Sequence, residues 1–448
     1  MENERRLYLK RQCKPFESLS PDDPRNVDLD VPDAEGRRAR GWDWVERIFR
    51  IVCDAQEPVC EFITGLSGNG KSTDLKKIAA KLRDQTGACY YPVIIDADSV
   101  VDLASSIDIT YVLFSILYEA ERTVLMLEHG SPEAAEDAMK EGFFRRVWTF
   151  LTETDVTLTE ARFSLENVAE LTFEMRSRAS LRKQVREVVA SHLTTILAMA
   201  RDELTLIEGR FKEAEVPEGG GRKYDGLVII YDSLEKLAGT EGNWREVRDS
   251  ALHLFSSGRH HLRLPVHVVY TVPPSVVLMN SMNISYLPMM RIREESTGAP
   301  FELGVDVMRS IVRKRIPDAD LEELLGEEAE DRISEIIQQS GGDPRYVIHL
   351  LYNMLSHRPL PLDCGAFRRF LNEAAENVRR TVFEDDFQRL REVEHRKSLL
   401  QRSDEQSQRT DRLLMNGVIL RYLNDHEWYD LHPSVRPMLE LDLGAEDA

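Results

Sequence analysis

One short segment constrains this chain more than any other, because it matches the pattern G-x-x-x-x-G-K-[ST] of a phosphate-binding loop. It runs from Gly65 to Thr73 with the sequence GLSGNGKST. An apolar run, Phe62 to Thr64, precedes the segment and a helical pattern follows it, which is the context that the motif requires. The segment therefore predicts a strand, a loop and a helix that together hold the phosphates of a nucleoside triphosphate.

Each part of this loop predicts a contact with the nucleotide. The glycines let successive backbone N–H groups converge on phosphate oxygens, and the N-terminus of the following helix adds a favourable dipole. Lys71 is expected to bridge the β- and γ-phosphates, and Ser72 is expected to ligate Mg²⁺. The loop residues predicted to bind the nucleotide are Gly65, Ser67, Gly68, Asn69, Gly70, Lys71, Ser72 and Thr73.

A second motif supplies the carboxylate that a magnesium ion needs. The apolar run Leu227 to Tyr231 ends in Asp232, which we predict to be a metal ligand. Three residues later, Glu235 is the candidate catalytic base that orients or deprotonates the attacking water. The alternative role for Glu235 is an exposed cap or an ion pair with Lys236.

Two further segments contain candidate nucleotide contacts. Thr271, near the end of a fourth apolar run, is a candidate sensor of the γ-phosphate or the attacking water, and the alternative is an ordinary strand-end threonine. In the segment Gly341 to Arg345 (GGDPR), Arg345 is a candidate detector of the γ-phosphate, and Pro344 is a candidate residue to line the adenine base. The alternative is a helix start with no ligand.

Apolar runs of strand length, separated by helical patterns, predict an α/β fold with a parallel five-stranded sheet. About 130 residues separate the second run from the third, far more than a simple crossover needs, and most of them have helical periodicity. Within this insertion we predict a long amphipathic helix from Ser177 to Lys212, either packed on the insertion itself or free to bind a partner. The five runs are Phe62 to Thr64, Tyr91 to Ile95, Leu227 to Tyr231, Val266 to Val272 and Ser285 to Ile292.

The segments after the fifth run are predicted to be helical, and a hairpin closes the chain. Helices are expected at Asp306 to Arg315, Leu321 to Ser340, Arg345 to Ser356 and Phe367 to Lys397. The alternating segment from Val418, the turn Asn424 to His426 and the run Glu427 to Leu431 predict the hairpin. Helix followed by hairpin is the pattern of a winged helix.

Composition excludes several classes of protein. With 42% apolar and 30% charged residues the chain is an ordinary globular protein, and its net charge of −20 disfavours nucleic acid as a default partner. Five cysteines without a CxxC pair suggest neither a zinc site nor a disulfide framework. The polar start and the lack of an apolar stretch of about 20 residues predict a cytoplasmic protein without a membrane anchor.

In these motifs the chain resembles P-loop ATPases of the AAA+/STAND kind, over roughly Trp42 to Met438. The spacing of Asp232 and Glu235 is closer to the STAND pattern, and GGDPR is similar to motifs of both groups. The segment LHPSVR is similar to the winged-helix histidine motif of STAND proteins, which implies that His432 contacts the β-phosphate; the alternative is a structural histidine. The resemblance implies ATP and Mg²⁺ as ligands, with GTP as the alternative nucleotide.

The resemblance also implies a domain plan. We expect an N-terminal arm at 1–41, an ATPase core at 42–303 with a helical insertion at about 130–224, a helical lid at 304–360 and a winged-helix-like domain at 361–448. Pro273 to Tyr286 holds no arginine, so the usual place of an AAA+ arginine finger is empty, with Arg259, Arg291 or Arg293 as substitutes. An effector or sensor is expected to be a separate polypeptide or the insertion, and a homo-oligomer is possible.

Three functions remain open at this point. The first is a slow, Mg²⁺-dependent ATPase that acts as a switch on a partner, as in a bacterial regulatory or anti-phage defence complex. The second is a DNA-acting initiator or transposition-type ATPase, against which the last 84 residues, 365–448, carry 13 basic and 17 acidic side chains. The third is a scaffold that binds ATP without hydrolysing it.

Overall fold

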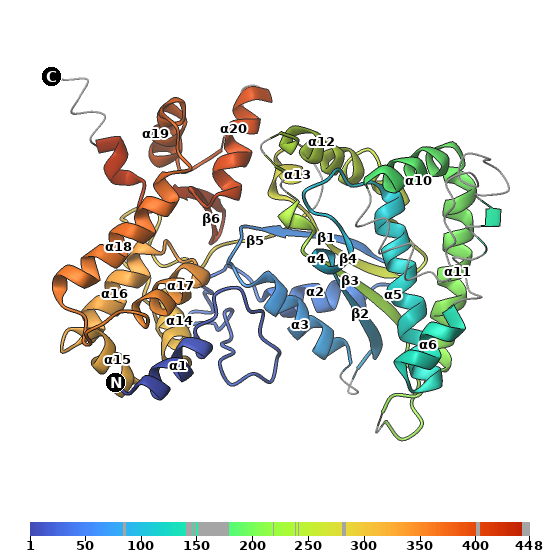
Figure 1. The fold of residues 1–448 in the computed structure, drawn as a ribbon, viewed down its shortest axis with the longest axis horizontal. Helices are drawn as coiled ribbons and strands as arrows, with labels where there is room; N and C mark the ends of the chain where they lie inside the picture. Colours follow the sequence, from blue (N-terminus) through green and yellow to red (C-terminus); the bar gives the residue numbers. More distant parts are fainter. Residues whose placement is uncertain are drawn as a thin grey trace. The chain divides into compact units, whose positions relative to one another are not determined.

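The computed structural model of the chain describes residues 1–83, 87–139, 146, 149–150, 179–217, 219–237, 239–240, 242–279, 284–399 and 404–440 (Figure 1). The chain forms two compact units, each assembled from segments that are distant in sequence. The first unit comprises Met1–Arg47, Gly65–Lys77 and Tyr286–Ala448. The second unit comprises Ile48–Thr64 and Ile78–Ser285.

A five-stranded sheet organises the α/β part of the chain, in the order β2-β3-β4-β1-β5. β1 runs parallel to β4 with Ile63 opposite Thr271, and β2 runs parallel to β3 with Asp96 opposite Asp232. The predicted α/β fold with a five-stranded parallel sheet is confirmed. The strands are β1 (Cys60–Gly65), β2 (Tyr90–Asp96), β3 (Gly226–Asp232), β4 (His267–Thr271) and β5 (Ser285–Leu287).

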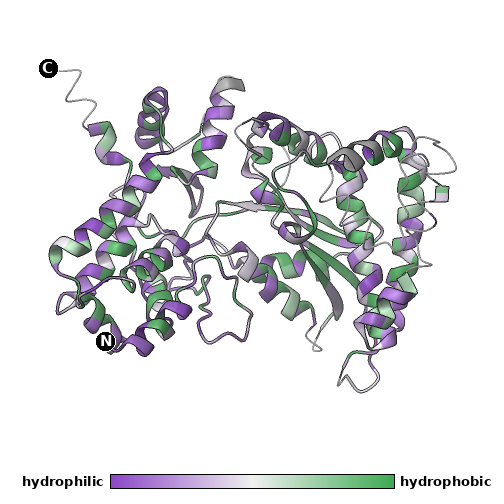
Figure 2. Ribbon diagram, in the orientation of Figure 1, coloured by the Kyte–Doolittle hydropathy of each residue, from purple (hydrophilic) through white to green (hydrophobic). Residues whose placement is uncertain are grey.

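The strands are apolar because helices cover the sheet, as the colouring of Figure 2 shows. All seven residues of β3 are buried. The Phe62 and Tyr270 rings stack with their centroids 5.7 Å apart, which ties β1 to β4. Two further helices of the second unit, α12 (Trp244–Phe255) and α13 (Pro274–Met279), add side chains to the same core.

The residues described between β2 and β3 are mostly helical, as predicted. They form α4 (Ala97–Val100), α5 (Ile109–His129), α6 (Pro132–Met139), α10 (Ala179–Ser191) and α11 (Leu193–Glu213), of which α5 contacts β2 and α11 contacts β3. The prediction of one long helix from Ser177 to Lys212 was wrong. The chain breaks at His192, whose N–H bonds to the Val189 carbonyl in a tighter turn, and residues 177–178 lie outside the described part.

The first unit is mainly helical, with its own core around Met308, Ile337 and Leu351. Two of its helices, α2 and α3, continue into the second unit. Its elements are α1 (Asn3–Gln12), α2 (Trp44–Cys53), α3 (Lys71–Leu82), α14 (Glu302–Arg313), α15 (Asp318–Leu325), α16 (Ala329–Gln339), α17 (Pro344–Met354), α18 (Cys364–Arg379), α19 (Phe387–Arg396), α20 (Asp404–Met415), β6 (Ile419–Leu423) and β7 (Glu427–Leu431).

Three predicted elements of this unit are shorter than expected. The helix predicted from Leu321 to Ser340 is two helices, because Gly326 takes a positive φ of 82° after α15. The helix predicted from Phe367 to Lys397 is also two, α18 and α19. The fifth strand ends at Leu287, because Met289 and Met290 donate their N–H groups to the carbonyls of Arg421 and Gly342 instead of a neighbouring strand.

Of the N-terminal segment and the C-terminal hairpin of the first unit, only the hairpin was predicted correctly. The N-terminal segment 1–41, for which no helix was predicted, begins with α1, which buries Leu9 completely. The predicted hairpin is confirmed: β6 and β7 are antiparallel, and Tyr422 stacks on Trp428 at 4.4 Å. The domain boundaries and the winged-helix assignment remain predictions. None of the helices in the described residues combines the length and apolarity that a membrane crossing demands.

Candidate nucleotide-binding site

The GLSGNGKST segment has the local structure that its motif predicts. Gly65 is the last residue of β1, and Lys71 is the first residue of α3. Gly68 and Gly70, at φ of 93° and 92°, adopt a left-handed backbone that other residues rarely take. The strand, loop and helix therefore present a helix N-terminus and loop amides suited to an anion.

Lys71 is held inside the loop in this structure. Its side chain is 4% exposed, and Nζ donates to the carbonyl oxygens of Gly65 at 2.8 Å and Leu66 at 2.9 Å. Asn69 also supports the loop, since its Nδ2 donates to the Leu287 carbonyl at 2.8 Å. A bound phosphate would offer the ammonium charged oxygens in place of neutral carbonyls, which are weaker acceptors.

The two hydroxyl residues that begin α3 have different surroundings. Ser72 is half-buried and offers a hydroxyl oxygen for a metal. The Oγ1 of Thr73 accepts a hydrogen bond from the Leu19 N–H at 3.2 Å, and therefore ties the N-terminal segment to this helix. The sequence predicted Thr73 as a nucleotide contact and gave no sign of its hydrogen bond with Leu19.

The GGDPR segment lies against the same loop. The Asp343 side chain caps α17 by accepting from the N–H groups of Arg345 and Tyr346. The guanidinium of Arg345 donates to Ser67 Oγ and lies 5.4 Å from the Phe16 ring. Pro344 is buried as the first residue of α17. The structure thus brings Arg345 to a residue of the phosphate-binding loop.

Asp343 is a functional candidate that sequence reasoning missed. A Cβ added at Gly68 would lie 2.4 Å from its Oδ1, so its carboxylate closely approaches the loop. Burial raises the pKa of Asp343 to about 6, while Arg345 and Lys71 act in the opposite direction. A buried acid beside this loop changes the electrostatic potential that an anion would meet there. Its place before a proline, where a helix begins, was the signal in the sequence.

His432 lies in the first unit and is 3% exposed. Its Nδ1 accepts from the Ser434 N–H at 3.2 Å, and its ring lies 5.1 Å from that of Tyr346. Burial lowers the pKa of His432 to about 3, so the ring is neutral. With Nδ1 as acceptor, Nε2 carries the proton and could contact a phosphate as a neutral donor.

The carboxylates of the second motif follow β3. Asp232 is 7% exposed at the end of this strand, and its Oδ1 accepts from the Ser233 N–H at 2.7 Å. Ser233 has a φ of 69°, which turns the chain sharply into the 3₁₀ helix Leu234–Lys236. Glu235 is half-buried in this helix, and Lys236 pairs with Asp98.

Thr271 is fully buried at the end of β4. Its hydroxyl accepts from the Leu234 N–H at 3.0 Å and donates to the Tyr231 carbonyl at 3.3 Å. These bonds join the end of β4 to the turn that carries Glu235. To contact a phosphate or a water, the hydroxyl would have to give up one of these two hydrogen bonds.

The three arginines proposed as substitutes for an arginine finger differ in exposure. Arg259 is exposed in the 3₁₀ helix Arg259–His261. The Arg291 guanidinium lies 3.7 Å from the centre of the Phe301 ring, and Arg293 Nε donates to Gln338 at 2.9 Å. Of the three, Arg259 therefore has the most accessible side chain for a neighbouring molecule.

The side chains of Ser72 and Asp232 are chemically suited to Mg²⁺ bound together with a nucleotide. Mg²⁺ prefers a few oxygen ligands from protein together with phosphate and water, and Ser72 and Asp232 are oxygen donors. Across the described residues, no cluster of three or more His, Cys, Asp and Glu side chains could hold a metal unaided. A metal brought by a triphosphate needs no such cluster.

Comparison with known proteins identifies distant structural likenesses. No protein family matches the sequence, and no curated protein matches it. A Walker-type ATPase of Pyrococcus abyssi is 12% identical with a TM-score of 0.37, covering 93% of this chain and 99% of its own. Aeropyrum pernix ORC1 in complex with DNA is 11% identical with a TM-score of 0.37, and the match covers 97% of this chain and 96% of the ORC1 chain. Aeropyrum pernix ORC2, in ADPNP-ADP complexes, is 10% identical with a TM-score of 0.36, and the match covers 94% of this chain and 98% of the ORC2 chain.

Proposed function

We propose that this chain is a slow, Mg²⁺-dependent ATPase of the AAA+/STAND type that acts as a switch on a partner. The observation that carries the proposal is GLSGNGKST placed between β1 and α3, with left-handed glycines and a buried lysine. Asp232 at the end of β3 and Glu235 in the 3₁₀ helix that follows add the acidic groups that hydrolysis needs.

In this proposal each residue has a defined task. The loop amides from Gly65 to Thr73 and the ammonium of Lys71 bind the β- and γ-phosphates. Ser72 and Asp232 hold Mg²⁺, which when bound neutralises charge on the phosphate oxygens. Glu235 orients the attacking water and accepts its proton, and Thr271 holds the turn that carries Glu235.

The switch is supported by the contacts of α17. Arg345 bonds Ser67 and Asp343 approaches Gly68, so a triphosphate entering the loop has to rearrange this segment or bind alongside it. We assign 304–360 as a lid and 361–448 as a winged-helix-like domain that follow this rearrangement, with Pro344 against the base and His432 at the β-phosphate. The partner is a separately encoded effector or sensor in a cytoplasmic regulatory or anti-phage defence complex, and the chain forms a homo-oligomer.

Phosphate release from Mg-ATP by the purified protein tests the proposal. The wild type should turn over slowly, Lys71→Ala should lose nucleotide binding, and Glu235→Gln should keep binding but lose turnover. Light scattering with ATP, ADP and no nucleotide reports the oligomer. Absent binding by the wild type would refute the proposal, and tight binding without turnover would make the chain an ATP-dependent scaffold.

A DNA-acting ATPase is the second candidate, and one feature favours it. α20 followed by the β6–β7 hairpin is a helix-then-hairpin arrangement that DNA-binding winged helices also have. Duplex DNA added to the same assay separates the two candidates. Strong stimulation at about 0.1 M salt would favour the DNA-acting ATPase, whereas unchanged turnover supports the protein switch.

A further inference from the structure

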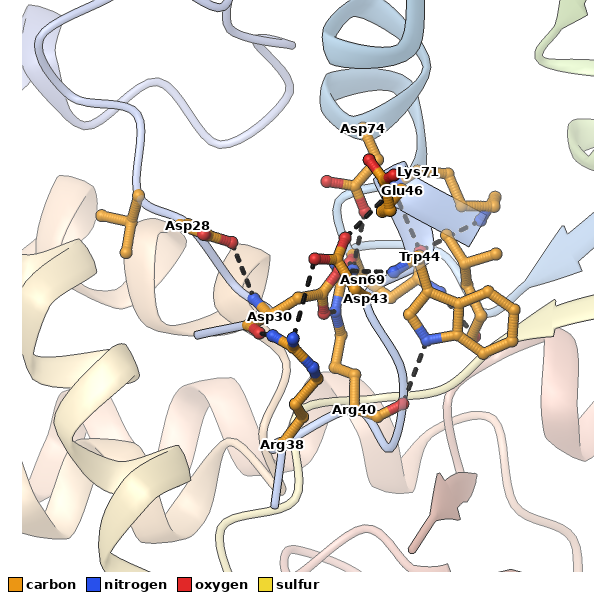
Figure 3. Close-up of polar contacts among 12 residues, drawn as sticks. Asp28, Asp30, Arg38, Arg40, Asp43, Trp44, Glu46, Asn69, Lys71 and Asp74 are labelled. Atoms are coloured by element: carbon orange, nitrogen blue, oxygen red, sulfur yellow. Dashed lines mark hydrogen bonds and ion pairs between the residues drawn. The ribbon is translucent and has the colours of Figure 1, made fainter. Parts of the chain in front are cut away.

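A buried ion triplet lies directly beside the phosphate-binding loop. Arg40, in the segment before α2, is 1% exposed and forms two bonds of 2.8 Å with the carboxylate of Asp30. Its Nη1 also donates to Asp74 Oδ2 at 2.7 Å. Figure 3 shows Arg40 between these acids, with the Trp44 indole bonded to its carbonyl oxygen. The first unit contains all of these residues.

Arg40 also contacts the loop itself. Nη1 donates to the backbone carbonyl of Asn69 at 3.3 Å. In a planar trans peptide the carbonyl and the following N–H point in opposite directions, so a carbonyl held toward Arg40 turns the Gly70 N–H away from it. The loop amides are the groups that bind phosphate in such a motif. Arg40 therefore sets the direction of one of them.

The charge of Asp74 gives Arg40 a second task. Asp74 lies in the first turn of α3, where an uncompensated carboxylate would repel the anion that this helix N-terminus is meant to attract. Its Oδ1 has no hydrogen-bond partner in the described part of the chain, and Arg40 is the cation paired with its other oxygen. Asp30 and the Trp44 N–H, which bonds Asp30 Oδ2 at 2.9 Å, hold the guanidinium in place.

We propose that Arg40 is a positioning residue for phosphate binding: it orients the Asn69–Gly70 peptide of the loop and neutralises Asp74 at the start of α3. The N-terminal segment then forms part of the nucleotide site. Four further hydrogen bonds join this segment to α3: Lys76 donates to the carbonyl and the hydroxyl of Ser18, Lys77 donates to the Val27 carbonyl, and the Leu19 N–H donates to Thr73. This inference rests on the proposed function, in which the loop binds a nucleoside triphosphate.

Binding of Mg-ATP and Mg-ADP by calorimetry tests the inference in the full-length chain. Arg40→Lys keeps a cation that can pair with one carboxylate, but a single ammonium cannot reproduce the guanidinium's bonds to Asp30, Asp74 and the Asn69 carbonyl together. We expect a folded variant whose Kd for both nucleotides rises at least tenfold. Amide hydrogen exchange should become faster at 65–73 while exchange in the strands of the sheet stays unchanged, whereas a loss of global stability alone would speed exchange in both. Arg37→Gln, an exposed arginine of the same segment, is the matched control and should bind as the wild type does.

A neutral triple variant separates orientation from charge. Arg40→Gln with Asp30→Asn and Asp74→Asn removes all three charges, so it should fold without a buried unpaired ion yet keep the weakened affinity. Wild-type affinity in this triple variant, or in Arg40→Lys, would overturn the inference. If the wild type itself binds no nucleotide, the proposed function fails; if only Lys71→Ala loses binding and the Arg40 variants do not, the positioning role alone fails.

Discussion

At the scale of single residues, Gly68 is a position where the loop leaves no room for a side chain. Its φ of 93° strains any other residue by about 1–2 kcal/mol, and a Cβ would lie 2.4 Å from Asp343 Oδ1. Gly68→Ala should therefore weaken Mg-ATP binding at least about tenfold, measured by calorimetry. Gly36→Ala is the matched control, because Gly36 has a similar φ of 79° but open space around it. Equal ATP affinity in both variants would contradict the close approach of Asp343.

Asp343 should make stability depend on pH. Its folded-state pKa of about 6 lies above the ordinary value of 3.8, so the folded chain favours the protonated acid, and that stabilisation is lost as the pH rises from about 4 through 6. Asp343→Asn keeps a cap for α17 but cannot ionise. Its Tm relative to the wild type should therefore increase from pH 5 to pH 7.5. A constant difference in Tm across this range would show that Asp343 ionises normally.

At the scale of elements, the β6–β7 hairpin depends on one aromatic pair. Trp428 is 2% exposed and stacks on Tyr422 directly opposite, while Arg421 bonds the Tyr286 carbonyl at 2.8 Å. Trp428→Ala should lower the free energy of unfolding by about 3–5 kcal/mol, measured by urea denaturation. His426→Ala in the exposed turn should change it by less than about 1 kcal/mol. A small effect of both changes would mean that the hairpin contributes little to the first unit.

Element prediction succeeded for the strands and most helices, where local pattern decides, but it missed the local helix breaks at His192 and Gly326 and failed where distant partners decide. The five strands and the hairpin follow from apolar runs and turn residues, and the loop follows from its motif. The end of β5 could not be predicted, because Arg421 and Gly342, which bond the backbone after it, are far away in sequence. The triplet of Asp30, Arg40 and Asp74 was missed for the same reason, since no spacing rule joins these three residues.

At the scale of the whole molecule, the net charge of −20 opposes compaction. Added salt screens this repulsion, with a Debye length that falls from about 30 Å at 0.01 M to about 10 Å at 0.1 M. The Tm should therefore rise by a few degrees when NaCl increases from 0.01 M to 0.15 M without nucleotide. A falling Tm would mean that attractive ion pairs dominate over the excess of acidic groups.

The interleaving of the two units has a consequence for biosynthesis. The loop from Gly65 to Lys77 belongs by its contacts to a unit that ends with the C-terminal segments, and Arg345 follows Ser67 by 278 residues. At about 10 residues per second a ribosome needs roughly half a minute to make that stretch. A nascent chain therefore carries its phosphate-binding loop for most of translation before the α17 segment exists to contact it.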